Sequence, residues 1–160
     1  MVLMEDKMDI NLENMRQDLI KAINLTDTNV NPDWIEISDL GCPHKTNKLP
    51  NGKMAVYIFF YKDECLKIGK AGPNSNSRYE NQHYDPNKSG SNLAKSILFD
   101  ETFNVKSISN KNIGDWIKNN TKRINILLNK ETGIFVLNFV EAYFQLKFKP
   151  KYEGFKTQNH

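Results

Sequence analysis

The chain alternates between short apolar runs and polar segments, and the spacing of the apolar residues predicts most of its elements. Near the start, Ile10, Met15, Leu19 and Ile23 recur at roughly helical spacing, with acidic residues early and a lysine late. Acidic side chains at the start of a helix and basic ones at its end suit the helix dipole. We therefore predict an amphipathic helix over residues 9–24.

A polar stretch follows and predicts a connector wrapped over the surface. Residues 25–53 are rich in Asn, Asp, Pro and Gly around one short apolar segment, WIEI at 34–37. The sequence LPNG at 49–52 predicts a turn immediately before the first long strand. Residues 1–50 are accordingly assigned to an N-terminal helix and connector, and residues 51–160 to the main domain.

Two runs rich in β-branched and aromatic residues predict a hairpin. They are MAVYIFFY at 54–61 and CLKIG at 65–69, separated by three polar residues. With 62–64 as the loop, the predicted pairs are Tyr61 with Cys65, Phe59 with Lys67, and Tyr57 with Gly69. Because side chains alternate across a strand, Tyr57 and Lys67 would be diagonal neighbours on one face, about 7 to 8 Å apart.

The rest of the chain predicts short helices and strands. SNS at 75–77 supplies candidate N-caps for a helix that carries Arg78 and His83. The further predicted elements are a loop at 85–91, helices at 92–99 and 113–120, strands at 102–109 and 122–129, and a helix at 133–149 that stops near Pro150. The predicted fold class is α+β: a small, mainly antiparallel central sheet flanked by helices, with the N-terminal helix as an addition.

Composition and charge narrow the class of protein. The chain has 160 residues, 39% of them hydrophobic, which suits one domain with a sizeable core. Its longest apolar run, 54–61, is far shorter than the roughly 20 residues that span a bilayer, and its start is acidic where a signal peptide is basic, so we expect a cytoplasmic protein without membrane partners. Two cysteines make no disulfide framework, and one adjacent histidine makes a weak zinc site.

The charge is unevenly distributed. The whole chain carries +3, but residues 1–50 carry −4 and residues 51–160 carry +7. A basic body suggests a polyanionic partner, with nucleic acid as the first candidate.

The last helix places one carboxylate among apolar residues. Leu137, Phe144 and Phe148 form a stripe at helical spacing, and Glu141 stands within it. A carboxylate facing a core is costly unless it is paired or binds a cation. Two interpretations stay open from this helix alone: a glutamate that pairs with a lysine, and a ligand of a metal ion.

Four short elements follow one another along the chain: Ala55-Val56-Tyr57, then KIGKAG at 67–72, then Arg78, then Glu141 followed by FKPKYEG. In this order they resemble the GIY-YIG endonuclease family. The family has two short blocks on neighbouring strands, a downstream arginine on one helix and a distant glutamate on another. The resemblance covers residues 53–154. Lys67 stands where the family name has tyrosine, as in a viral and bacterial branch, and Gln82 stands where many members have histidine or tyrosine, with His83 and Tyr84 directly after it.

The resemblance implies a DNA endonuclease that depends on Mg²⁺, with Mn²⁺ as a substitute, and that acts as a monomer or homodimer. Glu141 would hold the metal, Arg78 would grip the phosphate, and Tyr57 would orient or deprotonate water with Lys67 beside it. His83, Lys70, Tyr84 and the Gly69 turn would make further contacts to the DNA backbone.

The residue types also suit this chemistry without the resemblance. Phosphodiester hydrolysis needs an in-line water, positive charge on the phosphate oxygens and help for the leaving oxygen. An arginine fork and a carboxylate-bound hard cation supply the second and third of these. Two other classes remain: a non-catalytic nucleic-acid-binding module of the same fold, and a partner-binding or toxin-like protein. A P-loop at GKAG is excluded because alanine follows the lysine and the first glycine of that motif is missing.

Overall fold

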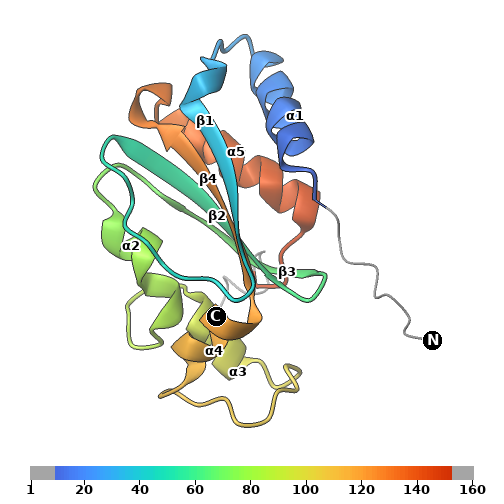
Figure 1. Cartoon of the computed structure of the whole chain (residues 1–160), viewed down its shortest axis with the longest axis vertical. Helices are drawn as coiled ribbons and strands as arrows, with labels where there is room; N and C mark the ends of the chain where they lie inside the picture. Colours follow the sequence, from blue (N-terminus) through green and yellow to red (C-terminus); the bar gives the residue numbers. More distant parts are fainter. Residues whose placement is uncertain (1–9, 153–160) are drawn as a thin grey trace, which may run out of the picture.

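A four-stranded antiparallel sheet forms the centre of the protein (Figure 1). The computed structural model describes residues 10–152; the predicted helix start at residue 9 and the predicted domain end at 153–160 lie outside this range. The strands are β1 (Ile35–Gly41), β2 (Lys53–Tyr61), β3 (Glu64–Ala71) and β4 (Lys122–Asn129), in the spatial order β1-β4-β2-β3. All neighbouring pairs are antiparallel, which confirms the predicted α+β class and mainly antiparallel sheet.

Helices cover both faces of the sheet. On one face, α1 (Leu12–Asn24) lies beside α5 (Ile134–Phe148). Towards the other face lie α2 (Asn76–Glu80), α3 (Leu93–Phe99) and α4 (Ile113–Asn120), with short 3₁₀ turns at Pro32–Trp34, Gln82–Tyr84 and Lys130–Thr132. The predicted helices at 92–99, 113–120 and 133–149 and the strand at 122–129 are therefore confirmed.

The alternation of β2 side chains divides the core into two layers. Val56, Ile58 and Phe60 pack with α1 and α5, whereas Tyr57 and Phe59 pack with the α2–α4 side. Every residue from 54 to 60 is buried, as expected for a central strand covered on both faces. Tyr57 consequently lies in the same layer as the short helices.

The connector contains a strand that the sequence pattern did not predict. The last three residues of WIEI begin β1, which pairs with β4 along most of its length, from Ile35 with Leu128 to Asp39 with Ile124. Residues 1–50 thus supply the fourth strand as well as α1, whose Met15, Leu19 and Ile23 are buried in the core. This short, half-polar run forms a strand because β4 lies beside it. The local sequence pattern does not reveal a partner so far along the chain.

Three other expectations are wrong. Residues 102–109 form turns rather than a strand, because Phe103 packs its ring against Tyr61 and Trp116 instead of joining the sheet. The helix predicted to carry both Arg78 and His83 ends at Glu80, and His83 lies in a separate 3₁₀ turn.

The hairpin turn is also shorter than predicted. Tyr61 pairs with Glu64 rather than Cys65, and a bulge between Phe59 and Phe60 restores the predicted pairing of Phe59 with Lys67 and of Tyr57 with Gly69. The diagonal relation of Tyr57 and Lys67 therefore holds.

The outer edge of β3 is partly covered by the segment that follows α5. Backbone N–H groups of Lys151 and Tyr152 donate to the carbonyl oxygens of Cys65 and Leu66, each at 3.0 Å. α5 ends at Phe148; the capping residue Lys149 adopts a left-handed conformation with φ 46°, and Pro150 follows. This turn directs the chain back along β3.

Candidate functional site

Tyr57 projects from the centre of β2 towards the outer edge of β3. Its ring is fully buried and lies over Gly69, the partner of Tyr57 across the hairpin. A Cβ atom at residue 69 would lie 2.6 Å from the Cε2 atom of the ring and 2.9 Å from the hydroxyl oxygen. Gly69, predicted as a contact to DNA, thus has a clear structural role, since it lets the tyrosine pass across the neighbouring strand.

The Tyr57 hydroxyl lies between a buried histidine and the Lys70 backbone. The His83 Nε2 atom lies 2.9 Å from this oxygen, and the Leu93 N–H donates to His83 Nδ1 at 3.2 Å. A neutral imidazole that accepts at Nδ1 carries its proton on Nε2, so His83 donates to Tyr57. The Arg78 side chain lies close enough to this hydroxyl to lower the pKa of Tyr57. The hydroxyl itself donates to the Lys70 carbonyl oxygen at 3.4 Å, which is a long bond.

Burial and nearby cations act in opposite directions on this tyrosine. Burial raises the pKa of Tyr57, and the hydrogen bond and charge of Arg78, together with the charge of Arg123, partly offset that rise. For His83, burial comes first and the charges of Lys67, Arg123 and Arg78 add to it, so its pKa lies well below 6.5. The imidazole is therefore neutral at pH 7, as the hydrogen-bond pattern requires.

Lys70 joins Tyr57 to the glutamate on the other side of the β3 edge. Its carbonyl oxygen accepts from Tyr57, and its Nζ atom lies 2.9 Å from Glu141 Oε1. The side chains of Lys70 and Glu141 are 34% and 18% exposed, so solvent reaches the pair. The charge of Glu141 is near enough to Tyr57 to raise its pKa. The lysine partner weighed for Glu141 from the sequence is therefore present.

The stripe around Glu141 matches the predicted pattern. Leu137 and Phe144 are buried, Phe148 is half-buried, and α5 lies against β3 and β2 through this face. The carboxylate emerges at the margin of the stripe, beside Lys70.

A metal ion would have to be held almost entirely by Glu141. Among residues 10–152, no three His, Cys, Asp or Glu side chains lie close enough to form a metal site. Mg²⁺ commonly keeps several waters and takes one or two carboxylates plus substrate phosphate oxygens. One part-exposed carboxylate fits that coordination, provided the ion shares Glu141 with the Lys70 ammonium or displaces it.

Lys67 lies on the same face of β3 as the Tyr57 ring and is buried. Its Nζ atom donates to Ser91 Oγ at 3.0 Å, in the loop before α3. Its charge also reaches His83, whose pKa it lowers. Lys67 therefore lies between the Tyr57–His83 pair and the surface around Ser91.

Tyr84 does not join this group. Its hydroxyl lies 2.8 Å from His44 Nε2 and accepts from Arg123 Nη1 at 2.9 Å, within the core. His44 Nδ1 lies 2.8 Å from the Thr121 carbonyl oxygen and so carries the proton, which makes Nε2 the acceptor for Tyr84. A DNA backbone does not reach this hydroxyl, so the predicted contact of Tyr84 to DNA finds no support in its position.

Arg123, which sequence reasoning did not single out, is buried beneath Tyr57. Its guanidinium carbon lies 4.9 Å from the centre of the Tyr57 ring and 4.8 Å from that of Tyr79. It donates to the Asn125 side chain, the Tyr84 hydroxyl and the Tyr79 carbonyl oxygen, each at 2.8 or 2.9 Å. The signal was available: Arg123 and Asn125 are polar residues two apart on one face of an otherwise apolar strand.

Comparison with known proteins gives no relative: no family model, curated protein or solved structure matches this chain significantly. None of the helices within residues 10–152 has the length and apolar character to cross a membrane.

Proposed function

We propose that the protein is a metal-dependent endonuclease that hydrolyses DNA phosphodiester bonds, of the GIY-YIG kind that its motifs resemble. The observation that carries the proposal is the interaction of three side chains from separate elements: the Tyr57 hydroxyl from β2, the Arg78 guanidinium from α2 and the Glu141 carboxylate from α5. The Tyr57 hydroxyl donates to the backbone carbonyl of Lys70, and the Nζ atom of the same lysine lies 2.9 Å from Glu141 Oε1. Arg78 is near enough to lower the pKa of Tyr57. A nucleophile-activating oxygen, a phosphate-binding cation and a metal-binding anion are the groups that this hydrolysis requires.

Arg78 is exposed and is the residue that meets the phosphate. Its planar fork can bind two phosphate oxygens while the charge neutralises the anion. Tyr57 then orients the attacking water or accepts its proton. The Nε2–H of His83 donates to the tyrosine oxygen and the charge of Arg78 lies nearby, so both stabilise negative charge that develops there.

Glu141 would hold Mg²⁺ or Mn²⁺, and the ion would supply Lewis-acid stabilisation of the leaving 3′ oxygen. Lys70 competes for the same carboxylate in the free protein. When a DNA phosphate arrives, Lys70 can turn to the phosphate and leave Glu141 to the cation. The buried amine of Lys67 lies on the Tyr57 side of β3, where it would assist Tyr57 in activating the water.

A non-catalytic DNA-binding module is the second candidate, and the Lys70–Glu141 ion pair favours it. In such a module the glutamate needs no metal, because the lysine already neutralises it. A partner-binding role is a third class and predicts neither DNA cleavage nor DNA binding.

The deciding experiment is cleavage of supercoiled plasmid with Mg²⁺ and with EDTA. We expect Mg²⁺-dependent nicked circles before linear DNA, because one small domain with one site cuts one strand at a time unless it dimerises. Arg78→Ala should lose this activity, and Lys88→Ala, which removes an exposed cation from the 85–91 loop, should retain it. Plasmid that is bound but stays supercoiled would favour the non-catalytic module; plasmid that is neither bound nor cut would favour the third class.

A further inference from the structure

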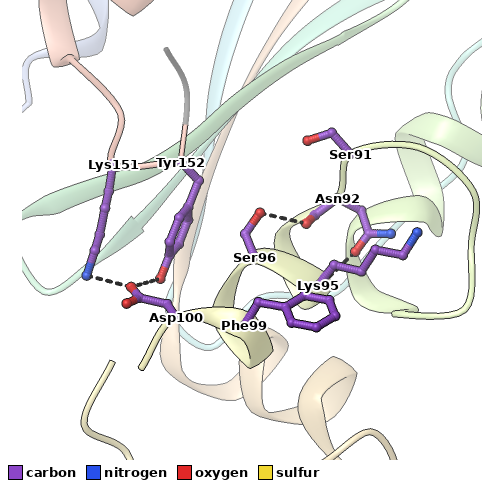
Figure 2. Close-up of a pocket in the computed structure, with 8 residues that line it drawn as sticks. All are labelled: Ser91, Asn92, Lys95, Ser96, Phe99, Asp100, Lys151 and Tyr152. Atoms are coloured by element: carbon purple, nitrogen blue, oxygen red, sulfur yellow. Dashed lines mark hydrogen bonds and ion pairs between the residues drawn. The ribbon is translucent and has the colours of Figure 1, made fainter. Parts of the chain in front are cut away.

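A pocket of about 690 Å³ lies between α3 and the segment that follows α5 (Figure 2). Lys95 and Phe99 of α3 line one side, and Lys151 and Tyr152 line the other, with Ser91 at the end of the loop that leads into α3. This volume is in the range of sites that bind small molecules, roughly 300 to 1,000 Å³.

The pocket is continuous with the candidate site along β3. Ser91 accepts the hydrogen bond from Lys67, and the Tyr152 N–H donates to the Leu66 carbonyl oxygen. Lys67 precedes Gly69, over which Tyr57 lies, by two residues, and two residues of a strand span about 7 Å. A ligand bound beside Tyr57 therefore has the pocket as its immediate neighbour.

The lining combines aromatic surface with positive charge. Phe99 is 81% exposed, so nothing within residues 10–152 covers its ring. Lys95 Nζ donates to the Gly90 carbonyl oxygen at 3.2 Å, and since an ammonium has three N–H donors it can bind a phosphate as well.

The acidic residue of the pocket is already neutralised. Asp100 Oδ2 lies 2.9 Å from Lys151 Nζ and accepts from the Tyr152 hydroxyl at 2.8 Å. Burial raises the pKa of Asp100, but hydrogen bonds from Thr102, Lys151 and Tyr152 outweigh it and hold the pKa well below its usual range. The carboxylate thus stays ionised and paired, and it orders Lys151 and Tyr152 along one wall of the pocket.

We propose that this pocket binds an unpaired base of single-stranded DNA, in the nucleotide next to the phosphate at Tyr57, Arg78 and Glu141. The position of the strand rests on the proposed function. A flat apolar ring beside cations suits a base that carries its own phosphate, and bases stack on exposed aromatic side chains in this way. A base within a duplex is paired and stacked and cannot enter, so the protein should prefer single-stranded or unpaired DNA.

The test is binding of fluorescein-labelled oligothymidine and of a fully paired duplex, measured by anisotropy in EDTA. Phe99→Ala should weaken single-strand binding by about 5-fold to 150-fold, the range for loss of one stacked base, and leave duplex binding unchanged. Phe135→Ala is the matched control, because this phenylalanine is also highly exposed, at 86%, but lies at the start of α5. An abasic oligonucleotide, which has the sugar-phosphate backbone but no bases, should bind wild type and Phe99→Ala with equal affinity.

Because Phe99 is exposed, its loss should leave thermal unfolding unchanged, and Lys95→Met provides a second variant that should weaken single-strand binding. Equal single-strand affinity of wild type and Phe99→Ala would overturn the pocket assignment, even for a protein that cuts plasmid. If the protein does not cut plasmid but its preference for single strands depends on Phe99, the pocket assignment would stand and the proposed nuclease activity would be wrong. A dimer in gel filtration that Phe99→Ala dissociates would assign the pocket to a second copy and overturn the proposal.

Discussion

The Tyr57 ring lies directly over Gly69, and any side chain at residue 69 would collide with it. Tyr57 reaches the outer edge of β3 because its neighbour on that strand has no side chain, and there its hydroxyl meets His83 and the Lys70 carbonyl. The hydroxyl can reach these polar partners only because residue 69 is a glycine.

Gly69→Ala should destabilise the protein by about 1 to 3 kcal/mol, the usual cost of forcing an extra carbon into a packed core. The added Cβ would meet three atoms of Tyr57 at 2.6 to 2.9 Å. Gly72→Ala is the control, since the nearest atom to its Cβ would be Ser75 Oγ at 3.9 Å. Urea unfolding of both variants measures the difference, and equal stabilities would contradict the packing described for Tyr57.

The free energy of unfolding should fall as the pH drops below 6.5, in part because of His83. Its pKa is lowered in the folded protein, mainly by burial, so below pH 6.5 the unfolded chain binds a proton that the folded chain does not. Each such histidine costs about 1.4 kcal/mol of stability per pH unit in that range. His44, whose pKa is also lowered by burial, adds to the slope.

The share of His83 is measured by comparing wild type with His83→Gln in urea at several pH values between 5 and 7. The variant should be less stable at pH 7, because Tyr57 and the Leu93 N–H lose their partner, but its stability should depend less steeply on pH. A slope as steep as that of wild type would show that His83 has the same protonation in the folded and the unfolded chain.

Glu141→Gln should abolish Mg²⁺-dependent cleavage and leave DNA binding intact or stronger. The amide cannot replace a carboxylate as a ligand of Mg²⁺, and Lys70 is released from its ion pair to contact phosphate. Because both partners are part-exposed, the loss of stability should stay under about 1 kcal/mol. Glu131→Gln, at an exposed position in the turn before α5, is the control. Undiminished cleavage by Glu141→Gln would refute the assignment of Glu141 as the metal ligand.

Lys67→Met should lower the cleavage rate by about 10² or more if Lys67 helps to activate the water together with Tyr57. Lys67→Arg should fail as well, since a guanidinium cannot accept a proton. Single-turnover rates across a range of pH are the measurement. Near-full activity of Lys67→Arg with an unchanged pH profile would reduce Lys67 to a phosphate contact and leave Tyr57 to act alone.

Local pattern was sufficient for the elements that bury a regular face. The spacing of Met15, Leu19 and Ile23 predicts α1, and the apolar run at 122–129 predicts β4 with the bounds that the structure shows. Pattern failed where a partner far along the chain decides the structure. β1 is a strand because β4 lies beside it, and residues 102–109 are not a strand because Phe103 finds an aromatic cluster instead.

For the candidate site, residue type and order led to Tyr57, Arg78 and Glu141, but their partners required the fold. Lys70 was expected on DNA and is held by Glu141, while Tyr84 was expected at the surface and is buried with Arg123. Charged side chains long enough to reach across elements have many possible partners, and sequence alone does not choose among them.

The backbone bonds from Lys151 and Tyr152 to β3 have a practical consequence for handling the protein. β3 is an edge strand, and an open edge is a template on which other chains can add and aggregate. The backbone N–H groups of Lys151 and Tyr152 donate hydrogen bonds to the carbonyl oxygens of Cys65 and Leu66 at this edge. Shortening the chain to end at Pro150 would expose this edge, so solubility on concentration should decline in such a truncation while the helices keep their circular dichroism signal.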